Sequence, residues 1–302
     1  MTLEQLRIFV AVAERQHVTQ AAKELNLAQS AASSAVNSLE EDLQTRLFNR
    51  IGRGIELTEA GRMFLGEARA VLARADAARL RIAEFGELKR GCLRIHASQT
   101  IASYWLPRHL MTFRTRYPQI EIHMSVGNTA EVAAAVHDGT AELGFVEGNV
   151  DDPNLIAMRV AGDRMVLVVA PGHPWAAAGA ITAQNLPATP WVLREPGSGT
   201  RSEFEAALAT MGVMLSALSI VIELPTNEAV RAAVETGSAA TVISASVAAP
   251  SLEAGLLHQV PFDLPERAFL SLRHKARYQS RSVRALLELI TTRIEIGPPG
   301  PT

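Results

Sequence analysis

Hydrophobic residues recur at helical spacing near the start of the chain. Ala32, Val36, Leu39 and Leu43 lie three or four positions apart and share one side of a helix over residues 29–43. Just before it, Ala21 and Ala22 are small enough to let a second helix approach closely, and residues 25–27 form a short polar turn between two leucines. The pattern predicts a helix-turn-helix.

The next segment predicts a two-stranded wing. Residues 49–58 place Gly52 and Gly54 at a tip between short apolar runs, and Thr58 is suited to cap the helix that follows. That helix spans residues 61 to about 86, with leucines and alanines on one side and arginines on the other. A helix of this length needs a partner for its apolar side.

Beyond a hinge at residues 87–91, short apolar runs alternate with helical patterns. The expected strands are residues 93–97, 120–126, 143–146, 165–170, 191–194, 219–224 and 241–244. Helices are expected at residues 106–117 and 130–138, and a last helix at 280 to about 294 precedes a frayed tail. This alternation predicts an α/β domain with parallel sheets.

The polar face of the helix at residues 29–43 carries small uncharged side chains instead of the usual Lys and Glu. Hydroxyls and amides on such a face can reach base edges and phosphates in a DNA major groove. An ordinary serine-rich surface helix is the alternative, and the segment alone leaves both open. In the wing, Arg50 and Arg53 flank the tip, where they can reach phosphates or the minor groove.

At this point the chain resembles the LysR-type family of bacterial transcriptional regulators, with no gap in the spacing. The matching residues are Leu6, Phe9, Ala21, Ala22, Leu25, Gln29, Ser30, Ser33, Leu39, Glu40, Leu43, Leu47, Phe48, Arg50, Leu57, Thr58, Ala60 and Gly61. The chain departs from the family where a basic or amide residue is usual in the middle of the recognition helix, because residues 33–35 are Ser-Ser-Ala. The expected DNA-binding residues are Gln29, Ser30, Ser33, Ser34, Asn37, Arg50 and Arg53.

The resemblance implies a three-part organisation. A winged helix-turn-helix DNA-binding domain spans residues 1–60, and a linker helix with its hinge spans 61–90. An effector-binding domain similar to periplasmic solute-binding proteins spans 91–302, with lobe 1 at about 91–160 and 266–302 and lobe 2 at about 161–265. Pairing of the linker helix with its copy in a second subunit implies a homodimer on a two-fold promoter DNA site, and two such dimers would form a homotetramer.

Small polar residues follow four of the expected strands, where helix N-termini meet ligands in α/β sheets. The expected effector-binding residues are Ser98, Gln99, Thr100, Asn128, Thr129, Glu147, Arg194, Gly197, Ser198, Gly199, Thr200 and Asn227. Residues 197–200, Gly-Ser-Gly-Thr, predict a concave anion nest, with a simple helix cap as the alternative.

Residues 194–201 are also similar to the regulators of carbon fixation and sulfur assimilation. That similarity implies a small oxyanion or phosphorylated metabolite as effector, with Arg194 or Arg201 as counter-charge. Glu147, Glu195 and Glu228 would oppose a highly charged anion if they face the same cleft.

Composition narrows the class of protein. The net charge is −2 with 48% hydrophobic residues, and residues 1–62 contain seven Lys or Arg against eight acids, so DNA binding must depend on where the charges lie. We expect no membrane helix and no signal peptide. The single cysteine, Cys92, excludes an internal disulfide and indicates a reducing, cytoplasmic location. We expect its thiol to be buried.

No catalytic set, metal ligand spacing or cofactor motif is recognisable, so we expect neither an enzyme nor a cofactor. The competing interpretation is a solute-binding protein or enzyme with an N-terminal helical domain that does not bind DNA.

Overall fold

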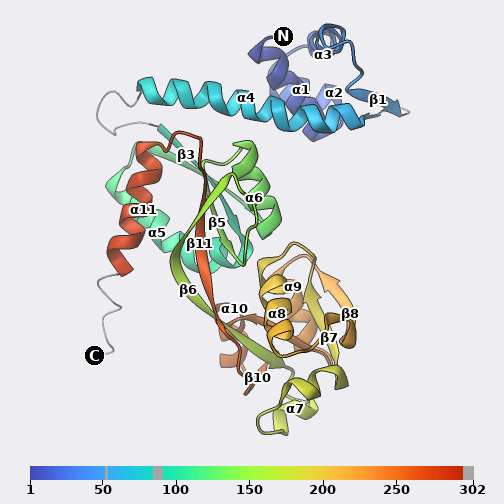
Figure 1. The fold of residues 1–302 in the computed structure, drawn as a ribbon, viewed down its shortest axis with the longest axis vertical. Coiled ribbons are helices and arrows are strands. Elements are labelled where there is room, and N and C mark those ends of the chain that lie inside the picture. The colour runs from blue at the N-terminus through green and yellow to red at the C-terminus, as the bar shows by residue number, and fades with distance from the viewer. Residues whose placement is uncertain (52–53, 84–90, 295–302) are drawn as a thin grey trace. The chain divides into compact units, whose positions relative to one another are not determined.

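The computed structural model describes residues 1–51, 54–83 and 91–294 of the chain (Figure 1). The chain forms two compact units, an N-terminal unit that runs from Met1 through the long helix α4 and a C-terminal unit that begins with strand β3.

The N-terminal unit consists of helices and one hairpin. Its elements are α1 (Leu3–Arg15), α2 (Val18–Glu24), α3 (Gln29–Asp42), β1 (Phe48–Ile51), β2 (Gly54–Leu57) and α4 (Glu59–Ala83). Between α2 and α3 the backbone of Asn26 is left-handed, with φ of 54°, and the Leu27 amide donates to the Ala22 carbonyl oxygen at 2.8 Å. Because Ala21 and Ala22 are fully buried there, the predicted helix-turn-helix is confirmed.

The core of this unit gathers on α1 and α3. Ala32, Val36 and Leu39 are buried, as their spacing predicts. Phe9 is completely buried and packs its ring against Phe48 at 5.4 Å and against Phe64 at 5.1 Å, centroid to centroid. One side chain therefore ties the wing and α4 to the first helix.

Helix α4 begins at Glu59, two residues before the predicted start, because the Thr58 hydroxyl accepts the Gly61 amide at 2.9 Å. Thr58 thus caps the helix as predicted. The predicted end of this helix and most of the hinge at 87–91 lie outside the described residues.

The C-terminal unit contains two lobes. Lobe 1 comprises β3 (Gly91–Ser98), a π-helix (Ile101–Trp105), α5 (Leu106–Arg116), β4 (Ile120–Gly127), α6 (Thr129–Asp138), β5 (Leu143–Glu147) and α11 (Arg281–Ile294). Lobe 2 comprises α7 (Pro174–Ala177), a 3-10 helix (Ala183–Ala188), β7 (Pro190–Arg194), α8 (Gly199–Thr210), a 3-10 helix (Leu215–Ala217), β8 (Ser219–Leu224), α9 (Asn227–Glu235), β9 (Ala240–Ser244), α10 (Ala245–Glu253) and β10 (His258–Val260).

Two long strands, β6 (Leu155–Val169) and β11 (Glu266–His274), join the lobes and run side by side (Figure 1). Strands β3, β4 and β5 are parallel, as are β7, β8 and β9, but β6 and β11 pair antiparallel with each other and with their neighbours. The expectation of parallel sheets is therefore right for these six strands and wrong for β6 and β11. A chain that crosses from one lobe to the other and returns must run in both directions.

The cysteine is also less buried than predicted. Cys92 lies at the start of β3 with intermediate exposure, and partial burial raises the pKa of its thiol. The raised pKa keeps the thiol protonated at neutral pH, which lowers its reactivity.

Two glycines of α4 make a matched pair for testing the packing of the N-terminal unit. A β-carbon at Gly61 would lie 2.1 Å from the Leu47 carbonyl oxygen, whereas a β-carbon at Gly66 has no neighbour within 4 Å. Gly61→Ala should destabilise the unit by roughly 1–3 kcal/mol through overpacking. Gly66→Ala should stabilise it by roughly 0.5–1 kcal/mol through helix propensity. Hydrogen–deuterium exchange of α1–α4 peptides measures both, and wild-type exchange in Gly61→Ala would contradict this packing.

Candidate functional site

The expected DNA-binding side chains of α3 share one face of the helix. Gln29, Ser30, Ser34 and Asn37 are exposed and Ser33 is half-buried, with the Gln29 amide donating to the Ser33 hydroxyl at 3.2 Å. Residue Ala28 at the N-cap offers no side chain to the first turn. The first backbone N–H groups of α3 are therefore open to an anionic group, which helix N-termini favour.

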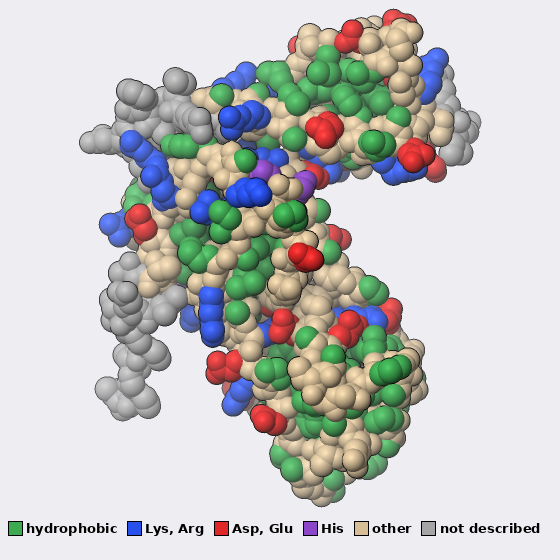
Figure 2. All heavy atoms as spheres, viewed as in Figure 1, with side chains coloured by type: hydrophobic (Ala, Val, Ile, Leu, Met, Phe, Trp, Pro, Cys, Tyr) green, Lys and Arg blue, Asp and Glu red, His purple; other side chains and the backbone are tan. Residues whose placement is uncertain are grey.

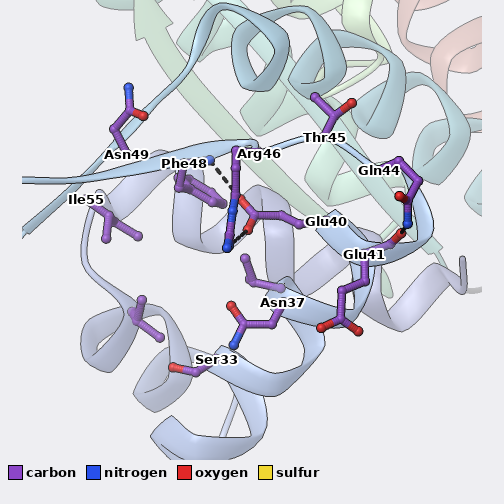
Figure 3. Close-up of a pocket in the computed structure, with 12 residues that line it drawn as sticks. Ser33, Asn37, Glu40, Glu41, Gln44, Thr45, Arg46, Phe48, Asn49 and Ile55 are labelled. Atoms are coloured by element: carbon purple, nitrogen blue, oxygen red, sulfur yellow. Dashed lines mark hydrogen bonds and ion pairs between the residues drawn. The ribbon is translucent and has the colours of Figure 1, made fainter.

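A hollow of about 780 Å³ lies between α3, the connector at residues 43–47 and the wing (Figure 3). Its lining residues are Val18, Ser33, Val36, Asn37, Glu40, Glu41, Gln44, Thr45, Arg46, Phe48, Asn49 and Ile55. Of these residues, Ser33 and Asn37 are expected from the sequence to bind DNA, and no role was predicted for the residues of the connector.

The wing is an antiparallel hairpin in which Phe48 pairs with Leu57 and Ile51 pairs with Gly54. The two wing arginines cannot be placed as side chains: only the backbone of Arg50 is described, in β1, and Arg53 lies outside the described residues. Their expected DNA contacts stay predictions.

In the C-terminal unit, the expected effector residues meet where the carboxyl ends of the parallel strands of both lobes face each other. Gln99 of lobe 1 is central. Its amide oxygen accepts from Arg194 Nη1 at 3.1 Å and from the Asn227 backbone amide at 2.7 Å. Its amide nitrogen donates to Glu228 at 2.9 Å, and the Tyr104 hydroxyl donates to the same carboxylate at 3.2 Å. One side chain of lobe 1 thus joins three residues of lobe 2.

Arg194 and Asn227 are both buried within this junction. Arg194 donates through Nε and Nη2 to both oxygens of Glu195, at 2.8 and 2.9 Å, and through Nη1 to Asn227 Oδ1 at 2.8 Å. The Asn227 amide nitrogen donates to the Thr100 hydroxyl at 2.9 Å, and the Asn128 side chain reaches Glu195 at 3.4 Å. Five of the predicted residues, Gln99, Thr100, Asn128, Arg194 and Asn227, therefore belong to one hydrogen-bonded network across the lobes.

The glycine-rich loop approaches lobe 1 closely. A β-carbon at Gly199 would lie 2.2 Å from the Glu147 carbonyl oxygen, and Gly197 has a positive φ of 91°. The Glu147 carbonyl also accepts from the Thr129 hydroxyl at 2.7 Å, while the Glu147 carboxylate accepts from the Ser98 hydroxyl. Gly199 is thus required by the contact between the lobes. Ser198 is buried and makes no capping hydrogen bond.

Sequence reasoning missed a second cationic centre. Arg267 is 1% exposed, and its Nε and Nη2 donate to Asp163 Oδ2 at 2.8 and 2.6 Å. Its Nη1 donates to the Thr200 hydroxyl at 3.1 Å and lies 3.8 Å from Glu147. No sequence signal marks this pair, since both residues lie in strand segments that the hydrophobic pattern did not predict. Arg201, one of the two expected counter-charges, instead pairs with Glu205 and Glu223 inside lobe 2.

Carboxylates outnumber arginines around the junction. The pKa of Glu203 is raised by burial, against an opposing effect of Arg267 and with a further rise caused by Glu147. The three glutamates that were expected to oppose a highly charged anion do face the junction: Glu147 contacts Ser98, Glu195 pairs with Arg194, and Glu228 contacts Gln99.

We also searched the described residues for a metal site and for a membrane-spanning helix. Within them, no group of three or more His, Cys, Asp or Glu side chains is arranged to hold a metal ion. Among the same residues, every helix is too short or too polar to cross a membrane. On the face drawn in Figure 2, acidic and basic side chains are interspersed.

Two family models match the chain. Residues 3–62 match the bacterial regulatory helix-turn-helix protein, lysR family, and residues 86–295 match the LysR substrate binding domain. The uncharacterized HTH-type transcriptional regulator YeiE of Escherichia coli (strain K12) is 35% identical over 95% of this chain and 96% of its own length. A probable RuBisCO transcriptional regulator of Cyanophora paradoxa is 30% identical over 99% of this chain and 94% of its own.

Solved structures share the fold. A full-length OxyR variant from Pseudomonas aeruginosa has a TM-score of 0.69 at 21% identity and covers 96% of this chain and 94% of its own. Full-length CbnR complexed with its target DNA has a TM-score of 0.67 at 24% identity, covering 97% of this chain and 99% of its own.

The raised pKa of Glu203 makes stability depend on pH. Because the pKa is higher in the folded protein than its ordinary value of 4.5, the folded state holds the proton longer as the pH rises. The stability of the wild-type protein therefore decreases as the pH rises from the ordinary pKa to the raised pKa. Glu203→Gln, which stays neutral, should raise Tm at neutral pH, with a gain that disappears as the pH falls below 4.5. The exposed Glu253→Gln serves as control in thermal melts across this range. A gain that is independent of pH would contradict the assignment.

Proposed function

The chain belongs to the LysR family of bacterial transcriptional regulators, and we propose that it reads promoter DNA with α3 and responds to a small, singly charged anion held between its lobes. It is a transcriptional regulator with a helix-turn-helix and an effector-binding domain, not an enzyme. The match of residues 3–62 to the helix-turn-helix model disfavours the competing solute-binding or enzyme interpretation.

The polar face of α3 carries the DNA-binding part of the proposal. Gln29, Ser30, Ser34 and Asn37 are exposed along α3, and the N-terminus of this helix has no side-chain cap. In a major groove, the amides and hydroxyls would contact base edges or phosphates, and the open N–H groups would receive a phosphate. The wing arginines, Arg50 and Arg53, are proposed as backbone contacts.

The hydrogen-bond donors around the Gln99 amide oxygen support the proposal of an anionic effector. This oxygen accepts from a guanidinium and from the N-terminus of α9, which is the pair of donors that an anionic oxygen favours. We propose that the effector's anionic oxygen takes this place, with Ser98, Thr100, Asn128, Thr129, Ser198 and Thr200 offering further hydrogen bonds. The carboxylates of Glu147, Glu195 and Glu228 disfavour a doubly charged phosphate monoester.

Gln99 forms hydrogen bonds across the junction. An effector that displaces its side chain would replace these hydrogen bonds between the lobes with its own. The effector then favours whichever lobe arrangement binds it better, and the coupling to DNA equals that difference in affinity. We further propose a homodimer or homotetramer in the cytoplasm as the working form. The relatives named as RuBisCO regulators are consistent with a role near carbon fixation.

Ser33→Glu tests the placement of α3. A carboxylate at this half-buried position on the polar face would lie against DNA phosphates, so we expect DNA affinity to fall by about a hundredfold or more, about 3 kcal/mol. Fluorescence anisotropy measures binding to a duplex that the wild-type protein selects from a randomised library. Ser216→Glu, an exposed serine of the C-terminal unit, carries the same charge change and should bind normally. Undiminished binding by Ser33→Glu would show that α3 is not the recognition helix.

Thermal melting against a panel of anions tests the effector. The panel contains aromatic and aliphatic monocarboxylates, which the proposal favours, and the more highly charged sulfite, sulfate, thiosulfate and phosphoglycolate, which it disfavours. A bound anion at a hundred times its Kd should stabilise the protein by about 2.7 kcal/mol. Gln99→Glu should abolish the shift, because its carboxylate occupies the site, and Thr100→Val and Ser198→Ala should weaken it. The exposed Thr115→Val should behave like wild type. Stabilisation by none of the anions would refute the anionic effector.

A further inference from the structure

The connector between α3 and the wing carries an arginine that the DNA-binding assignment does not use. We propose that Arg46, oriented by the buried carboxylate of Glu40, contacts a DNA phosphate, so that the recognition surface extends beyond α3 into residues 44–46. The inference rests on the proposed placement of α3 against DNA.

Glu40 is a buried carboxylate with every contact directed at the connector. Its side chain is 6% exposed. Oε1 accepts the backbone amides of Leu47 at 2.7 Å and Phe48 at 3.0 Å, and Oε2 accepts Arg46 Nη1 at 2.7 Å. A buried charge needs such partners, because burial without them is costly. The two amide contacts fix the start of β1, which leaves the third contact to orient Arg46.

Arg46 itself remains largely in solvent. Its side chain is 79% exposed although one nitrogen is bound to Glu40. A guanidinium carries five N–H donors, and Glu40 uses one of them. An ion pair this exposed adds little stability on its own. The pair therefore presents a fixed cation with free donors, which suits a phosphate.

The location of Arg46 matches that role. It lines the hollow that also contains Ser33 and Asn37, and among the described lining residues it is the one with a positive charge. Figure 3 shows Arg46 and Glu40 pointing toward each other next to Asn37, with Asn49 of the wing on one side and Glu41 on the other. Glu41 repels phosphates, so the contact belongs on the wing side of the hollow.

Charge balance makes a single contact of this kind measurable. Residues 1–62 contain seven basic and eight acidic residues, so each phosphate contact is a large part of the favourable electrostatic interaction. Each contact also contributes about 0.9 to the slope of log K against log salt. The loss of one contact should lower that slope by about one.

The first experiment compares Arg46→Gln with Arg7→Gln. Arg7 is a half-buried arginine of α1 that pairs with Asp76 of α4, and its substitution changes the net charge equally. Binding of the selected duplex is measured by anisotropy over a range of salt concentrations. We expect Arg46→Gln to bind DNA about tenfold more weakly. The magnitude of the slope of log K against log salt should decrease by about one. Arg7→Gln should keep the wild-type slope. Equal slopes for Arg46→Gln and Arg7→Gln would overturn the proposal.

A double-mutant cycle tests the positioning role of Glu40. If Glu40 acts through Arg46, Glu40→Gln should weaken DNA binding in the wild-type background and have no such effect in Arg46→Gln. Equal weakening in both backgrounds would show that Glu40 only holds β1, and would overturn its positioning role. Circular dichroism melts confirm that each variant is folded.

The two proposals fail differently. If Ser33→Glu binds DNA normally, the proposed contact between α3 and DNA is wrong, regardless of the result for Arg46→Gln. If Ser33→Glu abolishes binding while Arg46→Gln retains the wild-type salt slope, α3 is the recognition helix and the extension to Arg46 is wrong.

Discussion

The antiparallel ladder between β6 and β11 is the constraint on which the C-terminal unit depends. Parallel strands end at a common edge, so each lobe gathers its polar loops at one side of its sheet. The ladder, from Glu266 paired with Arg164 to His274 paired with Leu155, holds these two edges opposite each other. Arg267 and Asp163 are register partners in this ladder as well as an ion pair. The ion pair that joins the crossing strands therefore also places a cation, Arg267, near the junction. Because the ladder holds the two edges opposite each other, Gln99 of lobe 1 can contact Asn227 of lobe 2.

Charge pairing at that junction limits what it can recognise. Arg194 is neutralised by Glu195 and Arg267 by Asp163, so the site has no surplus positive charge in its present arrangement. A ligand must gain its affinity from hydrogen bonds in fixed directions, and net attraction contributes little. Burial of Glu203 with a raised pKa adds to this, because a further negative charge there is already unfavourable. Recognition by geometry is what a sensor that discriminates between small anions requires.

Local signals in the sequence predicted the local structure well. Alanine spacing predicted the helix-turn-helix, glycines the wing, and strand ends the loops that meet at the junction. What failed depends on contacts between distant residues. The first part of β6 carries apolar residues that are mostly exposed, such as Ile156 and Met158, and it lacks the alternation of apolar and polar residues that marks a half-buried strand. Glu40 follows Leu39 on an amphipathic helix, and in the sequence it resembles a solvated glutamate. In the structure it is buried, and its carboxylate accepts hydrogen bonds from backbone amides seven and eight residues away. Gly199 resembled part of an anion nest, and its neighbour turned out to be the Glu147 carbonyl of the other lobe.

The same device recurs in both units: a buried or half-buried carboxylate fixes an arginine. Glu40 holds Arg46, Glu195 holds Arg194, and Asp163 holds Arg267. Each pair is neutral as a whole, so its attraction for a polyanion is weak until the guanidinium contacts the anion directly. The guanidinium nevertheless keeps donors that point in a set direction. This arrangement reconciles a net charge of −2 with proposed sites for two anions, DNA and effector. It lowers nonspecific affinity while leaving the directional contacts intact, and the ratio of these two affinities is what determines specific binding among many competing sites.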